Sequence, residues 1–349
     1  MKILHIVAGA PTGGAEQFSF DAMKALHDSG VEQFVICRPY KHLTDAFDER
    51  GIKYKTISFS RFKKPWEQTS IKKAIAAYKP DVIHSWMSRA SSFVPAQKDI
   101  PVLGWFGGYY DLKNYKNCDF YMGVTRDIVR HIGEKSGAPD RAYVGHTFGT
   151  LEDDTPITRE SLGVPEGAKT VLLLSRMHWK KGVDTLLEAT KDMDDVYLLL
   201  AGNGPDLEKY KALAKELGVE NRAKFLGWRT DRKALLGIAD VCTLPSRYEP
   251  FGTVIAESWF AGVPLVATKA DGAKQYVEHD VNGLLSEIDD VEGLRENLVI
   301  ALNDEGARKR LINGGTKTYN ELFSREVVTQ GLIDSYEDIM FKFNKEKVA

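Results

Sequence analysis

Short apolar runs alternate with longer amphipathic stretches along most of the chain. Short runs bounded by Gly, Pro or charged residues predict strands, whereas apolar residues three and four positions apart predict helices. The predicted strands fall into two batches. The first batch is 2–7, 33–37, 54–59, 81–84, 102–105 and 120–124, and the second is 170–175, 196–201, 223–226, 240–244, 264–267 and 283–285.

Helical patterns lie between these runs, at 16–29, 72–78, 181–190, 207–217 and 294–302, and a last one covers 325–343. Alternation of strands and helices predicts parallel sheets wrapped by helices. Two batches of strands predict two doubly wound α/β domains, which suits a chain of 349 residues. The polar segment 149–170 separates the batches and contains two prolines. We therefore place the first domain at 1–155 and the second at 156–324.

Composition narrows the class of protein. The formal net charge of −2 argues against a general nucleic-acid binder. The cysteines Cys37, Cys118 and Cys242 are scattered, which predicts reduced thiols and no zinc site. No run approaches the ~18 apolar residues of a membrane span, and the first apolar run is too short for a secretion signal. We expect a cytoplasmic protein without a bound metal or cofactor.

The loops that follow strands are where open parallel sheets bind ligands. The turn 9–16 contains Gly13 and Gly14 at a predicted helix start, where backbone N–H groups suit a phosphate. A tight turn without a ligand is the alternative. Arg176 and Lys181 flank the next such helix start, and two cations there suit a diphosphate. A solvated basic turn is the alternative for this pair.

The segment SRYEPFGTVIAES, residues 246–258, follows the predicted strand 240–244. Glu249 lies in the loop, and the Pro250-Phe251-Gly252-Thr253 run opens a helix that contains Glu257. Carboxylates accept hydrogen bonds from hydroxyls, and free N–H groups at a helix start attract anionic oxygens. A nucleotide sugar has both groups. A dipole-stabilised acid near a helix N-terminus is the alternative for Glu257 alone.

This segment resembles the EPFGxxxxE motif of retaining glycosyltransferases of family 4, which have the GT-B fold. The segments GGAEQF, SRMHWKKG, AGNGP and FLGWRTD resemble other motifs of that family, in the same order along the chain. The resemblance implies two Rossmann-like domains that face each other across a cleft. It also implies that the last helix, in the segment 325–349, returns to the N-terminal, acceptor-binding domain, while the C-terminal domain binds the donor.

The resemblance also implies the roles of individual residues. Arg176 and Lys181 hold the donor diphosphate, Glu249 contacts the donor sugar, and Glu257 binds the ribose. The other implied donor contacts are Gly13, Gly14, Gly202, Asn203, Trp228, Pro250, Phe251, Gly252 and Thr253. In such enzymes the sugar is transferred with retention and the leaving phosphate accepts the acceptor proton. Cationic side chains and helix dipoles take the role of a metal ion.

One position departs from the family pattern. Many members carry His in the turn where this chain has Gly104-Trp105-Phe106-Gly107-Gly108. Phe106 stands in place of that His and predicts a more apolar donor pocket. His84 lies at the end of the predicted strand 81–84 and is a second candidate for a sugar or acceptor contact. A strand-end His satisfied within the protein is the alternative.

The segment 60–79 contains six Lys or Arg residues and one Glu, with Phe62 and Trp66 among them. Such a segment suits an anionic membrane surface, here the inner face of a cell membrane. A solvated helix face is the alternative.

We expect transfer of a sugar from a nucleotide-diphosphate donor, UDP before GDP, to a hydroxyl of a glycan or lipid-linked acceptor in cell-envelope synthesis. A nucleotide-sugar 2-epimerase of the GT-B fold and a non-catalytic nucleotide-sugar-binding protein are the alternatives. Epimerases are not expected to combine the EPFG and Arg-x4-Lys-Gly segments, and turnover with any donor separates an enzyme from a binding protein.

Overall fold

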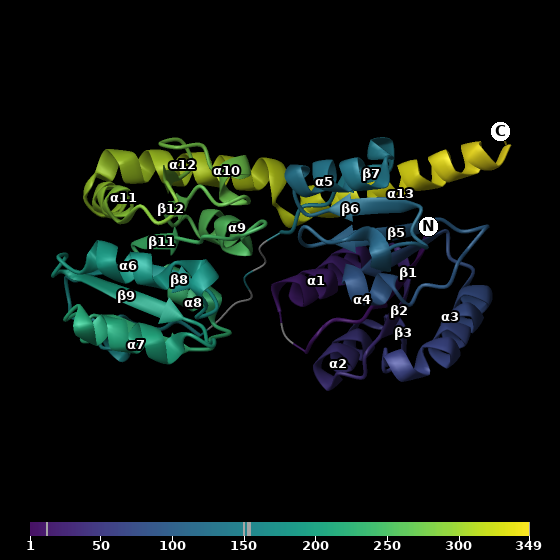
Figure 1. Cartoon of the computed structure of the whole chain (residues 1–349), viewed down its shortest axis with the longest axis horizontal. Coiled ribbons are helices and arrows are strands. Elements are labelled where there is room, and N and C mark those ends of the chain that lie inside the picture. The colour runs from purple at the N-terminus through teal and green to yellow at the C-terminus, as the bar shows by residue number, and fades with distance from the viewer. Residues whose placement is uncertain (12, 149–150, 152–154, 349) are drawn as a thin grey trace. The chain divides into compact units, whose positions relative to one another are not determined.

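The structure is a computed structural model that describes residues 1–11, 13–148, 151 and 155–348. The chain divides into two compact units (Figure 1). The N-terminal unit comprises Met1–Thr147 and Arg325–Ala349, and the C-terminal unit comprises Phe148–Ser324.

The N-terminal unit is built on a seven-stranded sheet in the order β3-β2-β1-β4-β5-β6-β7. All neighbouring strands are parallel. The strands are β1 (Lys2–Val7), β2 (Glu32–Cys37), β3 (Lys53–Thr56), β4 (Val82–Trp86), β5 (Val102–Phe106), β6 (Phe120–Gly123) and β7 (Ala142–Val144). The helices are α1 (Gly14–Asp28), α2 (Lys41–Arg50), α3 (Lys64–Tyr78), α4 (Met87–Ser91), α5 (Arg126–Ser136) and α13 (Arg325–Val348).

Helix α13 belongs to this unit although it ends the chain. The hydroxyl of Tyr336 lies 2.7 Å from Nδ1 of His84 on β4, and both side chains are buried. Tyr143 on β7 donates a hydrogen bond of 2.7 Å to Asp338. On the predicted apolar face of α13, Val328, Leu332 and Ile339 are buried, whereas Met340 and Phe343 are half-buried.

The C-terminal unit is built on a six-stranded parallel sheet in the order β10-β9-β8-β11-β12-β13. The strands are β8 (Lys169–Leu174), β9 (Val196–Ala201), β10 (Ala223–Gly227), β11 (Val241–Leu244), β12 (Leu265–Thr268) and β13 (Leu284–Ser286). The helices are α6 (Val183–Thr190), α7 (Leu207–Glu216), α8 (Arg232–Gly237), α9 (Thr253–Phe260), α10 (Ala273–Tyr276), α11 (Val291–Asn303) and α12 (Glu305–Leu322).

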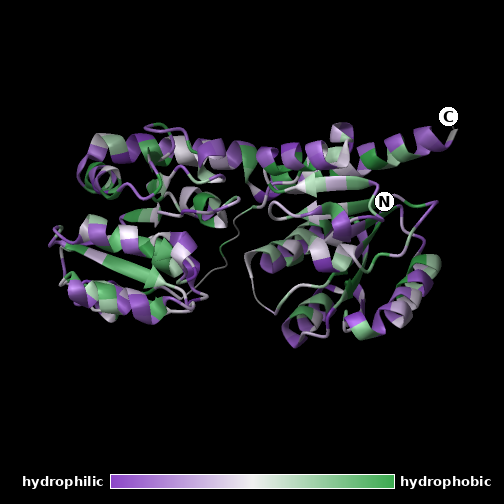
Figure 2. Cartoon of the chain, viewed as in Figure 1, coloured by the Kyte–Doolittle hydropathy of each residue, from purple (hydrophilic) through white to green (hydrophobic). Residues whose placement is uncertain are grey.

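The core of this unit forms where the strands are apolar on both faces. Leu198 and Leu200 on β9 pack in one cluster with Val171 and Leu173 on β8. Figure 2 shows β9 largely in the hydrophobic colour, whereas the helices around it carry both colours. Strands buried on both faces are typical of parallel sheets, and one apolar stripe is typical of the helices that cover them.

The predicted α/β class with two doubly wound parallel sheets is confirmed. All twelve predicted strands are present, two of them with the predicted bounds and the others shifted at one or both ends. The apolar pattern did not predict β7, a three-residue strand at the sheet edge. It also predicted only the second half of α3, because Pro65 and the charged residues beside it hide the first turn. None of the described helices has the length and apolar composition of a membrane span.

Candidate active site

The candidate site lies where the strand order of the C-terminal sheet reverses. The chain passes from β8 outward through β9 to β10 and then returns to place β11 on the other side of β8. Because all these strands are parallel, the loops that follow β8 and β11 meet at one edge of the sheet, and ligands bind at such a reversal. Arg176 and Lys181 lie in the first loop, and Glu249 lies in the second.

An ion pair joins these two loops. Nζ of Lys181 lies 2.5 Å from Oε2 of Glu249, and the two side chains are 20% and 15% exposed. The backbone N–H groups of Arg247 and Tyr248 both donate to the carbonyl of Lys180, at 2.8 and 3.2 Å. The structure therefore brings together two predicted site residues that are 68 positions apart.

Gly182 makes the close approach of the two loops feasible. Its φ is +62°, and a Cβ at this position would lie 1.9 Å from the carbonyl oxygen of Pro245. A larger residue would force the loops apart and separate Lys181 from Glu249. The glycine of the Lys-Gly pair therefore has a packing role beside the cation.

The second carboxylate of the motif, Glu257, lies inside α9 with 2% of its side chain exposed. Its Oε1 accepts a hydrogen bond from the Arg232 guanidinium, which comes from α8. Its Oε2 is buried and has no hydrogen-bond partner among the residues that the structure describes. Burial raises the pKa of Glu257, and the positive charge of Arg232 opposes this rise.

The N-terminus of α9 faces the same loop. Gly252 precedes the helix with a φ of +81°, and no side chain among the described residues caps the helix start. Phe251 is buried against the rings of Tyr276 and Phe323, at 5.7 and 5.5 Å between ring centroids, which anchors the loop. Pro250 and Thr253 remain partly exposed. The helix therefore presents a positive dipole end and unused N–H groups near Glu249.

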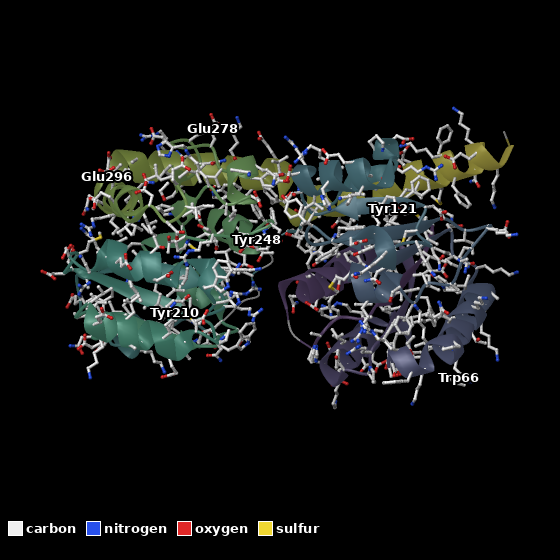
Figure 3. All side chains as sticks on the ribbon, viewed as in Figure 1. Trp66, Tyr121, Tyr210, Tyr248, Glu278 and Glu296 are labelled. Carbon is white, nitrogen blue, oxygen red and sulfur yellow. The ribbon has the colours of Figure 1, made fainter. Side chains whose placement is uncertain are left out.

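Three further predicted donor contacts are exposed at the same sheet edge. Arg176 follows β8, and no ion pair or hydrogen bond of its guanidinium occurs among the described residues. Asn203 follows β9, and Trp228 follows β10 with 60% of its side chain exposed. Tyr248, labelled in Figure 3, comes from the loop after β11. These loops supply a cation, an amide and two aromatic rings that are open to solvent.

Loop packing within the protein explains why position 202 is a glycine, whereas the sequence predicted a donor contact there. A Cβ at this position would lie 1.9 Å from the carbonyl oxygen of Ser175, in the loop after β8. Its absent side chain thus allows two loops of the protein to pack together. Whether a ligand also contacts Gly202 stays a prediction.

The glycine turn of the N-terminal unit contains a carboxylate. Oε1 of Glu16 accepts a hydrogen bond of 3.0 Å from the N–H of Ala10. A Cβ on Gly13 would lie 2.2 Å from the other oxygen of Glu16, whereas Gly14 has open space around it. The room that the sequence predicts for a phosphate at Gly13 is therefore filled by Glu16, and Gly14 is the open position.

Two predicted contact residues lie in the core instead. His84 has no exposed surface because Tyr336 of α13 covers it. Phe106 is also fully buried, and its ring stacks on Tyr115 with 3.8 Å between ring centroids. Neither side chain is open to a ligand in this structure, because Tyr336 of α13 covers His84 and Tyr115, which follows β5 in the chain, covers Phe106. A sugar or acceptor contact at these two residues stays a prediction.

Arg232 belongs to the site although no motif in the sequence predicted it. This residue lies 25 positions before Glu257, in a stretch with several other charged side chains. The sequence around Arg232 predicts only that it lies near a helix N-terminus. Its pairing with Glu257 depends on α8 and α9 being neighbours in the fold.

Similarity to known proteins identifies the family. The family model described as "Glycosyl transferases group 1" matches residues 154–318. A lipopolysaccharide core biosynthesis glycosyltransferase of Rhizobium meliloti, LpsD, is 31% identical over 342 residues, which cover 97% of this chain and 98% of that protein. The chain belongs to the group 1 glycosyl transferases. The family match covers most of the C-terminal unit, which contains both ion pairs of the candidate site.

Solved glycosyltransferase structures share the fold. A glycosyltransferase from Rickettsia africae has a TM-score of 0.84 at 22% identity and covers 97% of this chain and 98% of its own. Anabaena Alr3699/HepE, solved in complex with UDP-glucose, has a TM-score of 0.82 at 21% identity and covers 97% of this chain and 100% of its own. This group 1 glycosyltransferase therefore has the GT-B fold. Its described residues contain no group of three or more His, Cys, Asp or Glu that could hold a metal ion.

Proposed function

We propose that this glycosyltransferase transfers a sugar, with retention of configuration, from a nucleotide-diphosphate sugar to a hydroxyl acceptor, as family 4 enzymes do. The C-terminal unit binds the donor and the N-terminal unit binds the acceptor. The observation that carries the proposal is the pair of ion-paired carboxylates, Glu249 with Lys181 and Glu257 with Arg232, beside an uncapped helix start. Cations and N–H groups suit the diphosphate, and carboxylate oxygens suit the sugar and ribose hydroxyls.

Residue roles follow from charge and position. Arg176 is exposed and unpaired among the described residues, so its guanidinium is available to fork onto the diphosphate. Lys181 contacts the same phosphates while it holds Glu249, whose other oxygen is left for a hydroxyl of the donor sugar. As the sugar–phosphate bond breaks, these cations stabilise the charge that develops on the leaving phosphate, which accepts the acceptor proton.

The donor and acceptor classes rest on relatives. HepE was solved with UDP-glucose, which supports a UDP-linked donor, with GDP as the second choice. LpsD is named for lipopolysaccharide core biosynthesis and matches nearly the whole length of this chain. We therefore assign the acceptor to the growing glycan of a cell-envelope glycolipid.

A glycolipid acceptor lies in a membrane, and the segment 60–79 suits its surface. Phe62 and Trp66 are 93% and 73% exposed, and Trp66, which Figure 3 labels, lies in the first turn of α3. The one acid of the segment, Glu67, is buried and accepts hydrogen bonds from the backbone N–H groups of Ser58 and Ser60. The exposed charges of the segment are therefore all positive, which favours an anionic bilayer.

Substitution of Arg176 tests the donor site most directly. Arg176→Gln removes a charge-assisted hydrogen bond of roughly 1.5–3 kcal/mol, so turnover should fall roughly 10- to 100-fold. Stability should be unchanged, because the side chain is exposed and unpaired within the described part of the chain. Arg310→Gln, on the surface of α12, is the control. Parent-like turnover in Arg176→Gln would show that the diphosphate binds elsewhere.

A screen of nucleotide sugars for thermal stabilisation identifies the donor. A ligand at 100 times its Kd should stabilise the protein by about 2.7 kcal/mol. UDP-sugars should raise the Tm most. Stabilisation without any transfer to glycolipid acceptors would favour a binding protein over an enzyme.

A further inference from the structure

The ion pair between Arg232 and Glu257 has a geometry that a simple structural pair does not need. The guanidinium engages Oε1, while Oε2 is buried with no partner in the described structure. A buried carboxylate oxygen without a donor is costly, so a native structure that keeps one usually satisfies it with a ligand or a water molecule. The buried Oε2 is therefore suited to accept a hydrogen bond from a hydroxyl of a ligand.

We propose that Arg232 is a positioning residue, which keeps Glu257 a carboxylate and directs its second oxygen to a ribose hydroxyl of the donor. The inference rests on the proposed function, in which Glu257 binds the donor. Arg232 differs from the diphosphate cations in that it acts through Glu257. Because Oε2 is buried, a neighbouring side chain must shift before the ribose reaches it.

Among the groups that act on the Glu257 carboxylate, Arg232 is the one that carries a positive charge. Arg232 comes from α8, the Thr253 hydroxyl comes from the first turn of α9, and the Cys242 thiol comes from β11. Burial raises the pKa of Cys242 to about 12, so this thiol is neutral and adds no positive charge. Without Arg232, only the hydrogen bond of the Thr253 hydroxyl opposes burial, which is the largest influence on the pKa of Glu257 and favours its protonated form. A neutral carboxyl is a weaker acceptor for a hydroxyl than a carboxylate is.

The test measures how well the protein recognises the ribose hydroxyls. The Kd of UDP and of 2′,3′-dideoxy-UDP is measured by calorimetry between about pH 6 and pH 9. The ratio of the two Kd values reports the contribution of the ribose hydroxyls. Titration of the phosphates affects both nucleotides equally and does not change this ratio. If UDP does not bind the parent protein, GDP and 2′,3′-dideoxy-GDP replace the pair.

The parent protein should bind UDP roughly 10- to 100-fold more tightly than 2′,3′-dideoxy-UDP at every pH in this range. Arg232→Met should lose the preference at the acidic end and regain it as the pH rises and Glu257 ionises. Arg232→Lys should restore the preference at neutral pH because it restores the charge. Arg229→Met is the matched control, since Arg229 pairs with the partly exposed Asp231 just before α8, and it should behave as the parent does.

Variants of Glu257 and Arg232 separate the proposed ribose binding by Glu257 from the proposed positioning role of Arg232. If Glu257→Gln has the same ratio of the two Kd values as the parent protein, Glu257 does not bind the ribose and its assignment in the donor site is wrong. If Glu257→Gln loses the ratio but Arg232→Met keeps it at every pH, the role of Arg232 is overturned while that of Glu257 stands. Should Arg232→Met not fold, Arg232→Gln makes the same test with a smaller change in polarity.

Discussion

At the scale of single residues, the two glutamates of the EPFG segment have different surroundings. Glu249 lies in a loop and is paired with a lysine of the proposed diphosphate site, whereas Glu257 lies within α9 and is almost fully buried. A contact that strengthens in the transition state changes turnover, and a contact that is equal in both states changes affinity. The donor sugar changes geometry during transfer, but the ribose does not.

We expect Glu249→Gln mainly to lower kcat and Glu257→Gln mainly to raise the donor KM, each by roughly 10- to 100-fold. Steady-state kinetics with varied donor concentration measure both constants. Free-nucleotide titration provides the control, because it involves no transfer. Weakened nucleotide binding in Glu249→Gln together with parent-like binding in Glu257→Gln would reverse the two assignments.

Two buried histidines of the N-terminal unit predict acid sensitivity. Burial lowers the pKa of His5 to about 3 and lowers that of His84 well below its usual value. Below about pH 6.5 the unfolded chain binds protons at these residues that the folded chain does not. The free energy of unfolding should therefore fall as the pH drops from 6.5 toward 3, by up to about 1.4 kcal/mol per pH unit for each histidine.

Urea unfolding at a series of pH values measures this slope. His5→Gln and His84→Gln should each reduce the slope, whatever they do to stability at neutral pH. His42→Gln, at an exposed position, controls for the substitution itself. An unchanged slope in both buried variants would assign the acid sensitivity to other groups.

At the scale of elements, the segment of η1 (Arg61–Lys63) and α3 is distinguished by its two exposed aromatic rings. We expect the protein to sediment with vesicles of anionic lipid at low salt and to be released as salt is raised. Replacing Phe62 and Trp66 by Ser should weaken binding at every salt concentration. Charge reversal at Lys63 and Lys72 should weaken it most at low salt.

Phe341 on α13 offers a matched control, because its side chain is 67% exposed and lies outside this segment. Phe341→Ser should bind vesicles as the parent protein does. Equal binding to neutral and anionic vesicles, or none to either, would contradict the proposed surface.

Helix α13 is anchored to β4 by the contact between Tyr336 and His84. Nε2 of His84 already has no partner in the described structure, so Tyr336→Phe leaves neither ring nitrogen bonded. We expect a loss of about 1–3 kcal/mol in the free energy of unfolding. Tyr197→Phe, on β9, removes a hydroxyl for which no hydrogen bond occurs within the described part of the chain, and it should be close to neutral. Equal stability of the two variants would show that the buried contact contributes little.

At the scale of the whole molecule, the proposed donor site offers positive charge from side chains and from a helix start. Arg176, Lys181 and the N-terminus of α9 lie on loops at one edge of the C-terminal sheet. We expect turnover to be unchanged by EDTA, because these groups stabilise the leaving phosphate. Loss of activity in EDTA that Mg²⁺ or Mn²⁺ restores, measured on the purified enzyme, would contradict this prediction.

The sequence by itself determined the two α/β batches, the strand positions and the loops that carry the motifs. These features depend on local periodicity and on residues close together in the chain, such as Glu249 and Gly252. The resemblance of its motifs also predicted that Glu249 and Lys181 belong to one site, and the structure pairs these two side chains.

Only the tertiary structure decided which charges meet and which side chains are covered. Lys181 reaches Glu249 across 68 positions and Arg232 reaches Glu257 across 25, because the strand order and helix packing bring their elements together. His84 and Phe106 looked available at strand ends, but Tyr336 and Tyr115 cover them. Such contacts have no local signature, since apolar and polar patterns report the face on which a residue lies and not its distant partner.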